Sequence, residues 1–133
     1  MKVAALLVPV ICAIAAAQGE PGIEEMVFCT SVQDRAPVGE SAAFDNDVGT
    51  VWCFTKIVGA ELPDTVYHVW YYKDEEMARV ALAVSSDSWR TWSSKRVLES
   101  WAGVWRVEVQ TGDGTVLEAK EFAVRQPAPP GEG

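Results

Sequence analysis

The chain has 133 residues, a formal net charge of −8 and a single histidine. An acidic chain lacks the positive surface that binding to nucleic acid or to an anionic membrane requires, so we exclude both as partners. One histidine leaves little material for acid–base or nucleophilic catalysis, and we expect no catalytic residue and no cofactor.

Residues 1–17, MKVAALLVPVICAIAAA, have the pattern of a cleaved secretory signal peptide. Lys2 supplies the positive start, and Ala15 and Ala17 give the small residues of a cleavage site before Gln18. The apolar run between them is shorter than the about 20 residues that cross a bilayer as a helix. We therefore expect an exported protein, periplasmic or extracellular, with no membrane contact after cleavage. The alternative is an uncleaved membrane anchor.

The rest of the chain, about 116 residues, has the size of one domain and contains two cysteines, Cys29 and Cys53. An even number of cysteines in an oxidising compartment favours a disulfide, which would stabilise the fold by roughly 3 to 4 kcal/mol. The alternative is two free, buried thiols, because both cysteines lie in apolar runs typical of strands.

Residues 24–124 show short strand patterns separated by turn residues and no helical period. The expected strands are 26–32, 50–58, 65–73, 77–84, 89–98, 104–111 and 115–124. About seven strands without a helix must bury one sheet against another. This predicts an all-β fold, an immunoglobulin-like antiparallel β-sandwich, with a small β-barrel as the alternative. The tail, 125–133, has no strong apolar anchor and is expected to be disordered.

Apolar and polar residues alternate within several of these strands, which indicates the face that turns toward the core. The residues expected in the core are Trp105, Val107, Val109, Val80 and Leu82. The pair Asp113–Gly114 predicts a tight hairpin between the last two strands. A break in the alternation near Lys120 predicts a bulge there.

Five motifs follow one another along this domain: VWCFTKIVGA, HVWYYK, WRTWSSKR, GVWRVEV and GTVLEAKEF. Together they resemble a bacterial family, the domain of unknown function numbered twenty-nine fourteen, over about residues 24–124. The resemblance implies an exported β-domain, and it implies no reaction, ligand or catalytic residue.

Two chemical alternatives remain open in the sequence. A metal site would need Cys29, Cys53 and His68 to converge, a ligand set that suits zinc or copper(I), but their spacing matches no short metal motif. A hydrolase would need a base beside Ser93 or Ser94, and spacing alone does not show such an arrangement. We rank metal binding and hydrolysis behind a non-catalytic function and expect no metal site.

His68 lies in the strand pattern TVYHVWYYK, where it shares a face with Val66, Trp70 and Tyr72. We expect a structural histidine, hydrogen-bonded to backbone or to a neighbouring hydroxyl. The alternative is a histidine that contacts a ligand.

The motif WRTWSSKR carries two tryptophans and three cations within eight positions. Strand alternation places Arg90, Trp92, Ser94 and Arg96 on one face. We hypothesise a recognition surface that combines a stacking plane with hydrogen-bond donors. Its residues are His68, Trp70, Arg90, Trp92, Ser94 and Arg96. In the rival interpretation, the arginines pair with acidic residues and the tryptophans fill the core.

These features together predict an exported, non-catalytic binding or interaction module of the bacterial envelope. A flat sheet face or an open edge suits a protein partner. An aromatic platform with hydroxyls suits a glycan, so a carbohydrate-binding β-sandwich is the alternative. A purely structural envelope component without a ligand is the third possibility.

Overall fold

The computed structural model describes residues 20–127, so the expected signal peptide, 1–17, and residues 128–133 of the expected tail lie outside the described residues. Residues 20–127 form ten strands and no helix, which confirms the prediction of an all-β fold. Within this range no helix is long and apolar enough to cross a membrane.

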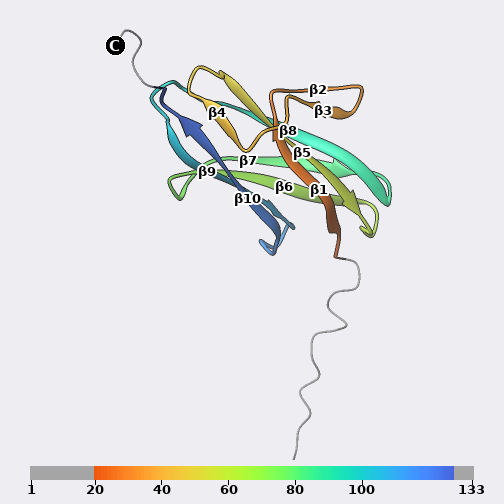
Figure 1. The fold of residues 1–133 in the computed structure, drawn as a ribbon. Helices are drawn as coiled ribbons and strands as arrows, with labels where there is room; N and C mark the ends of the chain where they lie inside the picture. Colours follow the sequence, from red (N-terminus) through yellow and green to blue (C-terminus); the bar gives the residue numbers. More distant parts are fainter. Residues whose placement is uncertain (1–19, 128–133) are drawn as a thin grey trace, which may run out of the picture.

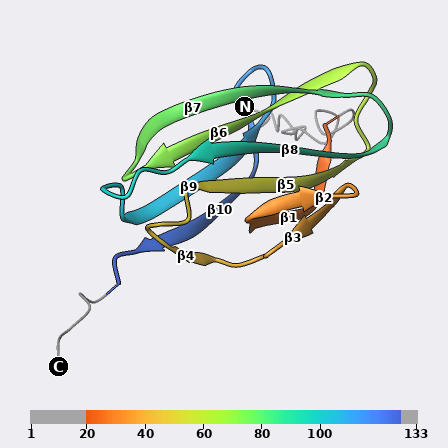
Figure 2. The same cartoon turned by 90° about the horizontal axis from the view of Figure 1, so that it is seen from above.

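The strands form two main sheets and one small hairpin, arranged in layers (Figures 1 and 2). The three-stranded sheet has the order β1 (Gly22–Cys29), β5 (Thr50–Val58), β8 (Ser88–Arg96). The five-stranded sheet has the order β4 (Ala43–Asp45), β10 (Val116–Arg125), β9 (Gly103–Gln110), β6 (Asp64–Tyr72), β7 (Glu75–Val84). The hairpin consists of β2 (Ser31–Gln33) and β3 (Ala36–Val38).

Six of the seven long strands are distributed between the two sheets as in an immunoglobulin-like sandwich; the fourth, β7, pairs with β6 in the wider sheet, whereas constant-type immunoglobulin domains place it in the other sheet. Such domains place their first, second and fifth strands in one sheet and the third, sixth and seventh in the other. If the three-residue strands are set aside, β1, β5 and β8 are the first, second and fifth, and β6, β9 and β10 are the third, sixth and seventh. The predicted sandwich is therefore confirmed. The short strands β3 and β4 were not predicted, because three residues are too few to show an alternation. The expected strand 26–32 joined the end of β1 to the start of β2, which the structure separates at Thr30.

The core lies between the inner faces of the two sheets. Trp105, Val107 and Val109 of β9 are fully buried, as predicted. Val80 and Leu82 pack against the same core but are only half-buried. They lie on β7, the edge strand of the wider sheet, where the narrower sheet gives less cover.

The predicted bulge near Lys120 is in the wrong place. The register between β10 and β9 shifts between Val116 and Glu118, and it is regular at Lys120, which pairs with Val107. The Lys120 side chain therefore starts on the inner face, and its amine donates a hydrogen bond to the carbonyl of Met26 on β1 at 2.8 Å. The long aliphatic part of the lysine side chain packs at the inward position, and its charged amine reaches the polar carbonyl at the edge of the sandwich. This explains why a charged residue occupies an inward position.

The predicted disulfide is absent, because Cys29 and Cys53 are both free thiols. They lie on neighbouring strands, as expected, but Cys53 pairs with Phe28 and Cys29 pairs with Trp52. This offset of one residue sends the two side chains to opposite faces of the sheet. Both are buried, and burial raises the pKa of each thiol. The alternative of two free, buried thiols is the correct one.

The β2–β3 hairpin lies against β1 and β5 of the three-stranded sheet (Figure 1). Its two turn residues, Asp34 and Arg35, both have positive φ, and neither is glycine. Gly39 follows the hairpin at φ 75°, and a Cβ at this position would collide with the Thr30 hydroxyl. Because Thr30 also bonds Val38 through its backbone and its side chain, this close approach fixes the hairpin to the end of β1.

Candidate functional site

A fully hydrogen-bonded polar cluster lies inside the sandwich. Thr55 of β5 and Ser93 of β8 face His68 and Trp70 of β6 across the core. His68 Nδ1 lies 2.7 Å from Ser93 Oγ, and His68 Nε2 lies 3.1 Å from Thr55 Oγ1. Trp70 Nε1 donates to the same Ser93 oxygen at 3.1 Å. The cluster therefore joins the two sheets by polar contacts within an otherwise apolar core.

The hydrogen bonds of this cluster fix the tautomer of His68. Thr55 Oγ1 donates its only hydrogen to the carbonyl of Thr91 at 2.9 Å, so it must accept at its contact with His68. Nε2 of His68 therefore carries the imidazole proton, and Nδ1 accepts from the Ser93 hydroxyl. Each hydroxyl donates once and accepts once, and no buried side-chain nitrogen or oxygen among the described residues lacks a partner.

This Ser93–His68 pair has the contact distance of a nucleophile and its base, but it is sealed from solvent. His68 is 0% exposed and Ser93 is 6% exposed. Burial lowers the pKa of His68 to about 4, which weakens it as a base at neutral pH. The geometry supports the structural role expected for His68, in which neighbouring hydroxyls hold the ring.

The six residues of the hypothesised recognition surface do not lie on one surface. His68 and Trp70 are 0% exposed, in the core. The other four lie on the opposite, outer face of β8, because their positions alternate with the inward Ser93. These four, Arg90, Trp92, Ser94 and Arg96, do form the single row that the alternation predicted.

On the outer face of β8, the indole of Trp92 packs against a buried aromatic ring. Trp92 pairs with Phe54 of β5 across the strands, and the two rings stack with centroids 6.1 Å apart and planes 10° from parallel. Phe54 is 1% exposed although it lies on an outer face, with Trp92 on one side and Val27 of β1 on the other. Trp92 itself is partly exposed. Its orientation is thus fixed by packing, while part of the ring remains accessible. Phe54 was not predicted as a site residue, because its apolar character alone indicates a position in the core.

The arginines divide between the two sheets by their pairing. Arg79, Arg106 and Arg125, all on the five-stranded sheet, form ion pairs with acidic side chains. Arg90 and Arg96, on the three-stranded sheet, form no ion pair with any residue in 20–127. The part of the rival interpretation that pairs the arginines with acids therefore fails for these two.

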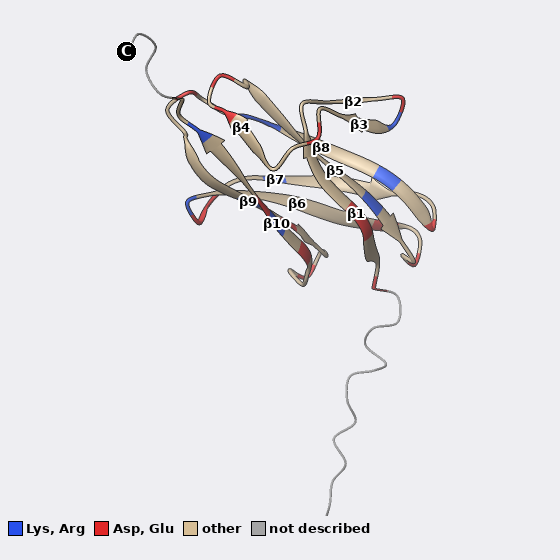
Figure 3. Ribbon diagram, viewed as in Figure 1, with Lys and Arg blue, Asp and Glu red and all other residues tan. Residues whose placement is uncertain are grey.

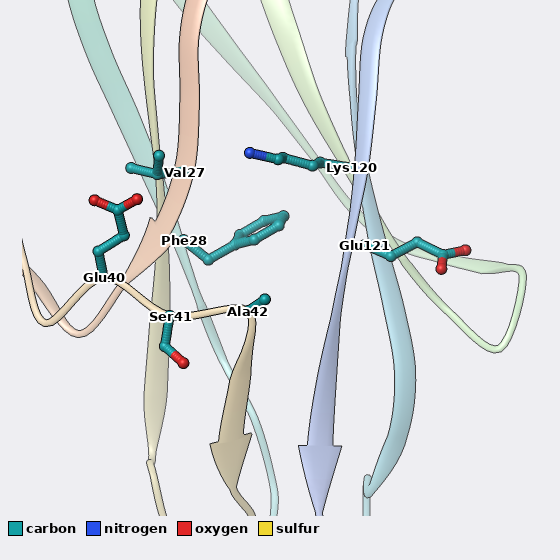
Figure 4. Close-up of a pocket in the computed structure, with 7 residues that line it drawn as sticks. All are labelled: Val27, Phe28, Glu40, Ser41, Ala42, Lys120 and Glu121. Atoms are coloured by element: carbon teal, nitrogen blue, oxygen red, sulfur yellow. The ribbon is translucent and has the colours of Figure 1, made fainter.

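Two hollows on the surface lie away from the indole of Trp92. One of ≈350 Å³ lies between β1 and β10, where Lys120 extends toward β1 and Glu121 points away (Figure 4). A second, of ≈360 Å³, lies at the end of β8, and its lining includes Arg96, Asp47 and Glu99. Trp92 lines neither of them. Of the row on β8, Arg96 lines the second hollow, and Trp92 lies on the sheet face outside both hollows.

Fold and site define an immunoglobulin-like sandwich domain with a sealed polar core and an outer face of arginine and tryptophan. Residues 63–124 match the family described as Protein of unknown function (DUF2914), which confirms the resemblance seen in the sequence over this part of the chain. The match covers β6 to β9 and nearly all of β10, and the VWCFTKIVGA motif on β5 lies outside it. No curated protein matches the chain. The family's description names no activity, so the function has to be inferred from the geometry.

Proposed function

We propose that this protein is an exported, non-catalytic interaction module of the bacterial envelope that binds a protein partner through the outer face of β8. One observation carries the proposal. A partly exposed Trp92 lies on the buried Phe54, in a row with two arginines that have no ion-pair partner in residues 20–127. Tryptophan and arginine are the residue types most enriched at the energetic centres of protein interfaces.

The non-catalytic part of the proposal is supported by the state of the one serine–histidine pair. Both hydroxyls in contact with the His68 ring already donate one hydrogen bond and accept one within the core. A substrate would have to enter the packed core to reach Ser93, which is 6% exposed. We therefore assign this pair to the stability of the fold.

A glycan is the second candidate, because sugar rings also stack on an indole and bond to hydroxyls such as that of Ser94. Sites for small ligands are concave as a rule. Trp92 lies on a sheet face and lines neither of the two hollows described above. This shape favours a protein partner over a carbohydrate.

Site-specific photo-crosslinking in producing cells tests the proposal. A photoreactive amino acid at Ser94 samples the outer face of β8, and one at Ala81 samples an exposed position on the outer face of the five-stranded sheet. We expect a discrete crosslinked protein from Ser94 and none from Ala81. Equal crosslinking from both positions, or from neither, would contradict the assigned face.

Export is tested on the same cells. We expect the protein in the envelope or medium fraction, with Gln18 as its first residue by intact mass and N-terminal sequencing. An unprocessed chain in the cytoplasmic fraction would contradict the proposed location.

A further inference from the structure

We infer that Arg90, beside Lys56, is the binding site for a carboxylate group of an extended acidic segment in the protein partner. The inference rests on the proposed function and names the chemistry of the partner at the same face. It is carried by the charges, the register and the free edge of the three-stranded sheet.

Two cations lie directly opposite one another on this sheet. Arg90 of β8 is the register partner of Lys56 of β5, and Figure 3 shows basic segments on both strands. Like charges that face each other across two strands destabilise a sheet. Arg90 and Lys56 therefore place two positive charges side by side on the outer face of an acidic protein.

The nearby acids compensate Lys56 and leave Arg90 uncompensated. Lys56 forms an ion pair with Glu24 at 3.4 Å, and its other register partner is Glu25 on β1. Both acids lie on the β1 side of Lys56, away from β8. Arg90 is exposed and forms no ion pair within residues 20–127. Its guanidinium presents a planar set of donors that matches a carboxylate.

Trp92, next to Arg90 on the outer face of β8, indicates what kind of group carries the carboxylate. Arg90 and Trp92 are two positions apart on one face of a strand, a separation of about 7 Å. A carboxylate bound at Arg90 would therefore bring the neighbouring part of its carrier over the exposed part of the indole. The stack on Phe54 holds that indole in place before any partner arrives.

The free edge of β8 favours a polypeptide as the carrier. β8 is the last strand of the three-stranded sheet, so one side of its backbone has no strand partner among the described residues. An extended peptide can bond to this edge and project alternate side chains over the outer face. The inward Lys95, a residue type that discourages strand addition, lies at the far end of β8 and contacts Trp101 and the carbonyl of Arg96.

Binding to defined polyanions tests the inference. Poly-L-glutamate provides carboxylates on a polypeptide, and polygalacturonate provides carboxylates on a glycan. Titrations at one fixed, low ionic strength should show tighter binding to poly-L-glutamate. Arg90→Gln should weaken this binding about tenfold, since it removes charge-assisted hydrogen bonds. Arg125→Gln, which removes the same charge from an arginine paired with Asp45 on the other sheet, should change it less than twofold.

Thermal melting separates this site from a structural role of Arg90. Removal of one of two facing cations should leave the melting temperature of Arg90→Gln unchanged or raised, whereas a structural arginine would lower it. The inference would be overturned if poly-L-glutamate did not bind, if polygalacturonate bound more tightly, or if both variants weakened binding equally. A lowered melting temperature of Arg90→Gln would also overturn it. If the crosslink from Ser94 persists in Arg90→Gln, the proposed function stands and the carboxylate site is wrong. If Ser94 gives no crosslink in the unsubstituted protein, the proposed function itself fails.

Discussion

Acidification from pH 7 to pH 5 should cost the protein about 2 kcal/mol of unfolding free energy through His68 alone. Burial lowers the pKa of this side chain from 6.5 to about 4 in the folded protein. Between these two values the unfolded chain binds a proton that the folded chain does not. The contribution of His68 is therefore fully present above pH 6.5 and is lost as the pH falls toward 4.

The magnitude follows from the interval between the two pKa values. One pH unit within the interval is worth about 1.4 kcal/mol. The interval from 6.5 to about 4 gives about 3 kcal/mol in total, and about 2 kcal/mol of it falls between pH 7 and pH 5. The hydrogen bonds explain the direction. A protonated ring would donate from Nδ1 to Ser93, and the hydroxyl hydrogen of Ser93 would lose its acceptor.

Urea unfolding at pH 7 and pH 5, followed by tryptophan fluorescence, measures this loss. The chain has one histidine, so His68→Gln is a control without a titrating imidazole. We expect the variant to be less stable at pH 7 but nearly independent of pH across this window. If the variant does not fold, the NMR titration of the imidazole in the unsubstituted protein decides. A folded-state pKa near 6.5 would refute the reasoning.

Three other predictions follow from the core, the thiols and the hairpin. Trp105→Ala should cost about 3 to 5 kcal/mol through lost burial and a cavity, and a denaturant melt showing less than about 1 kcal/mol would contradict its placement. Cys29 and Cys53 should both be unreactive toward a thiol reagent in the native protein and should both react after denaturation without reductant; fewer than two reactive thiols would contradict the free pair. Gly39→Ala should destabilise by more than about 1 kcal/mol, and by more than Gly59→Ala, a glycine with positive φ but open space around it; equal losses would exclude the contact with Thr30.

The alternation of side chains predicted the inner faces well where strands are long and lie centrally in a sheet. Trp105, Val107 and Val109 occupy every second position of β9, and the period of a strand allows them only one common face. The same alternation selected the outward row of β8 correctly. It could not show that His68 and Trp70 face inward, because both faces of β6 are aromatic and either could meet the core.

The wrong and missing predictions concern features that depend on how strands pair and turn, which the sequence of one strand does not show. The disulfide prediction treated Cys29 and Cys53 as neighbours, and only the pairing register shows that they face opposite sides of the sheet. The cation pair of Lys56 and Arg90 was not recognised for the same reason, since the two residues lie far apart in the sequence. The β2–β3 hairpin was missed because its positive-φ turn contains no glycine.

The polar cluster in the core has a consequence for how the sequence can change over evolution. Its donors all point one way, from Trp70 through Ser93, His68 and Thr55 to the carbonyl of Thr91. Replacement of any one member by an apolar residue leaves a buried donor or acceptor without a partner, whereas joint replacement by apolar residues of similar shape can be nearly neutral. We therefore expect relatives of this chain to keep or lose these four side chains together, so that they vary as one character across an alignment.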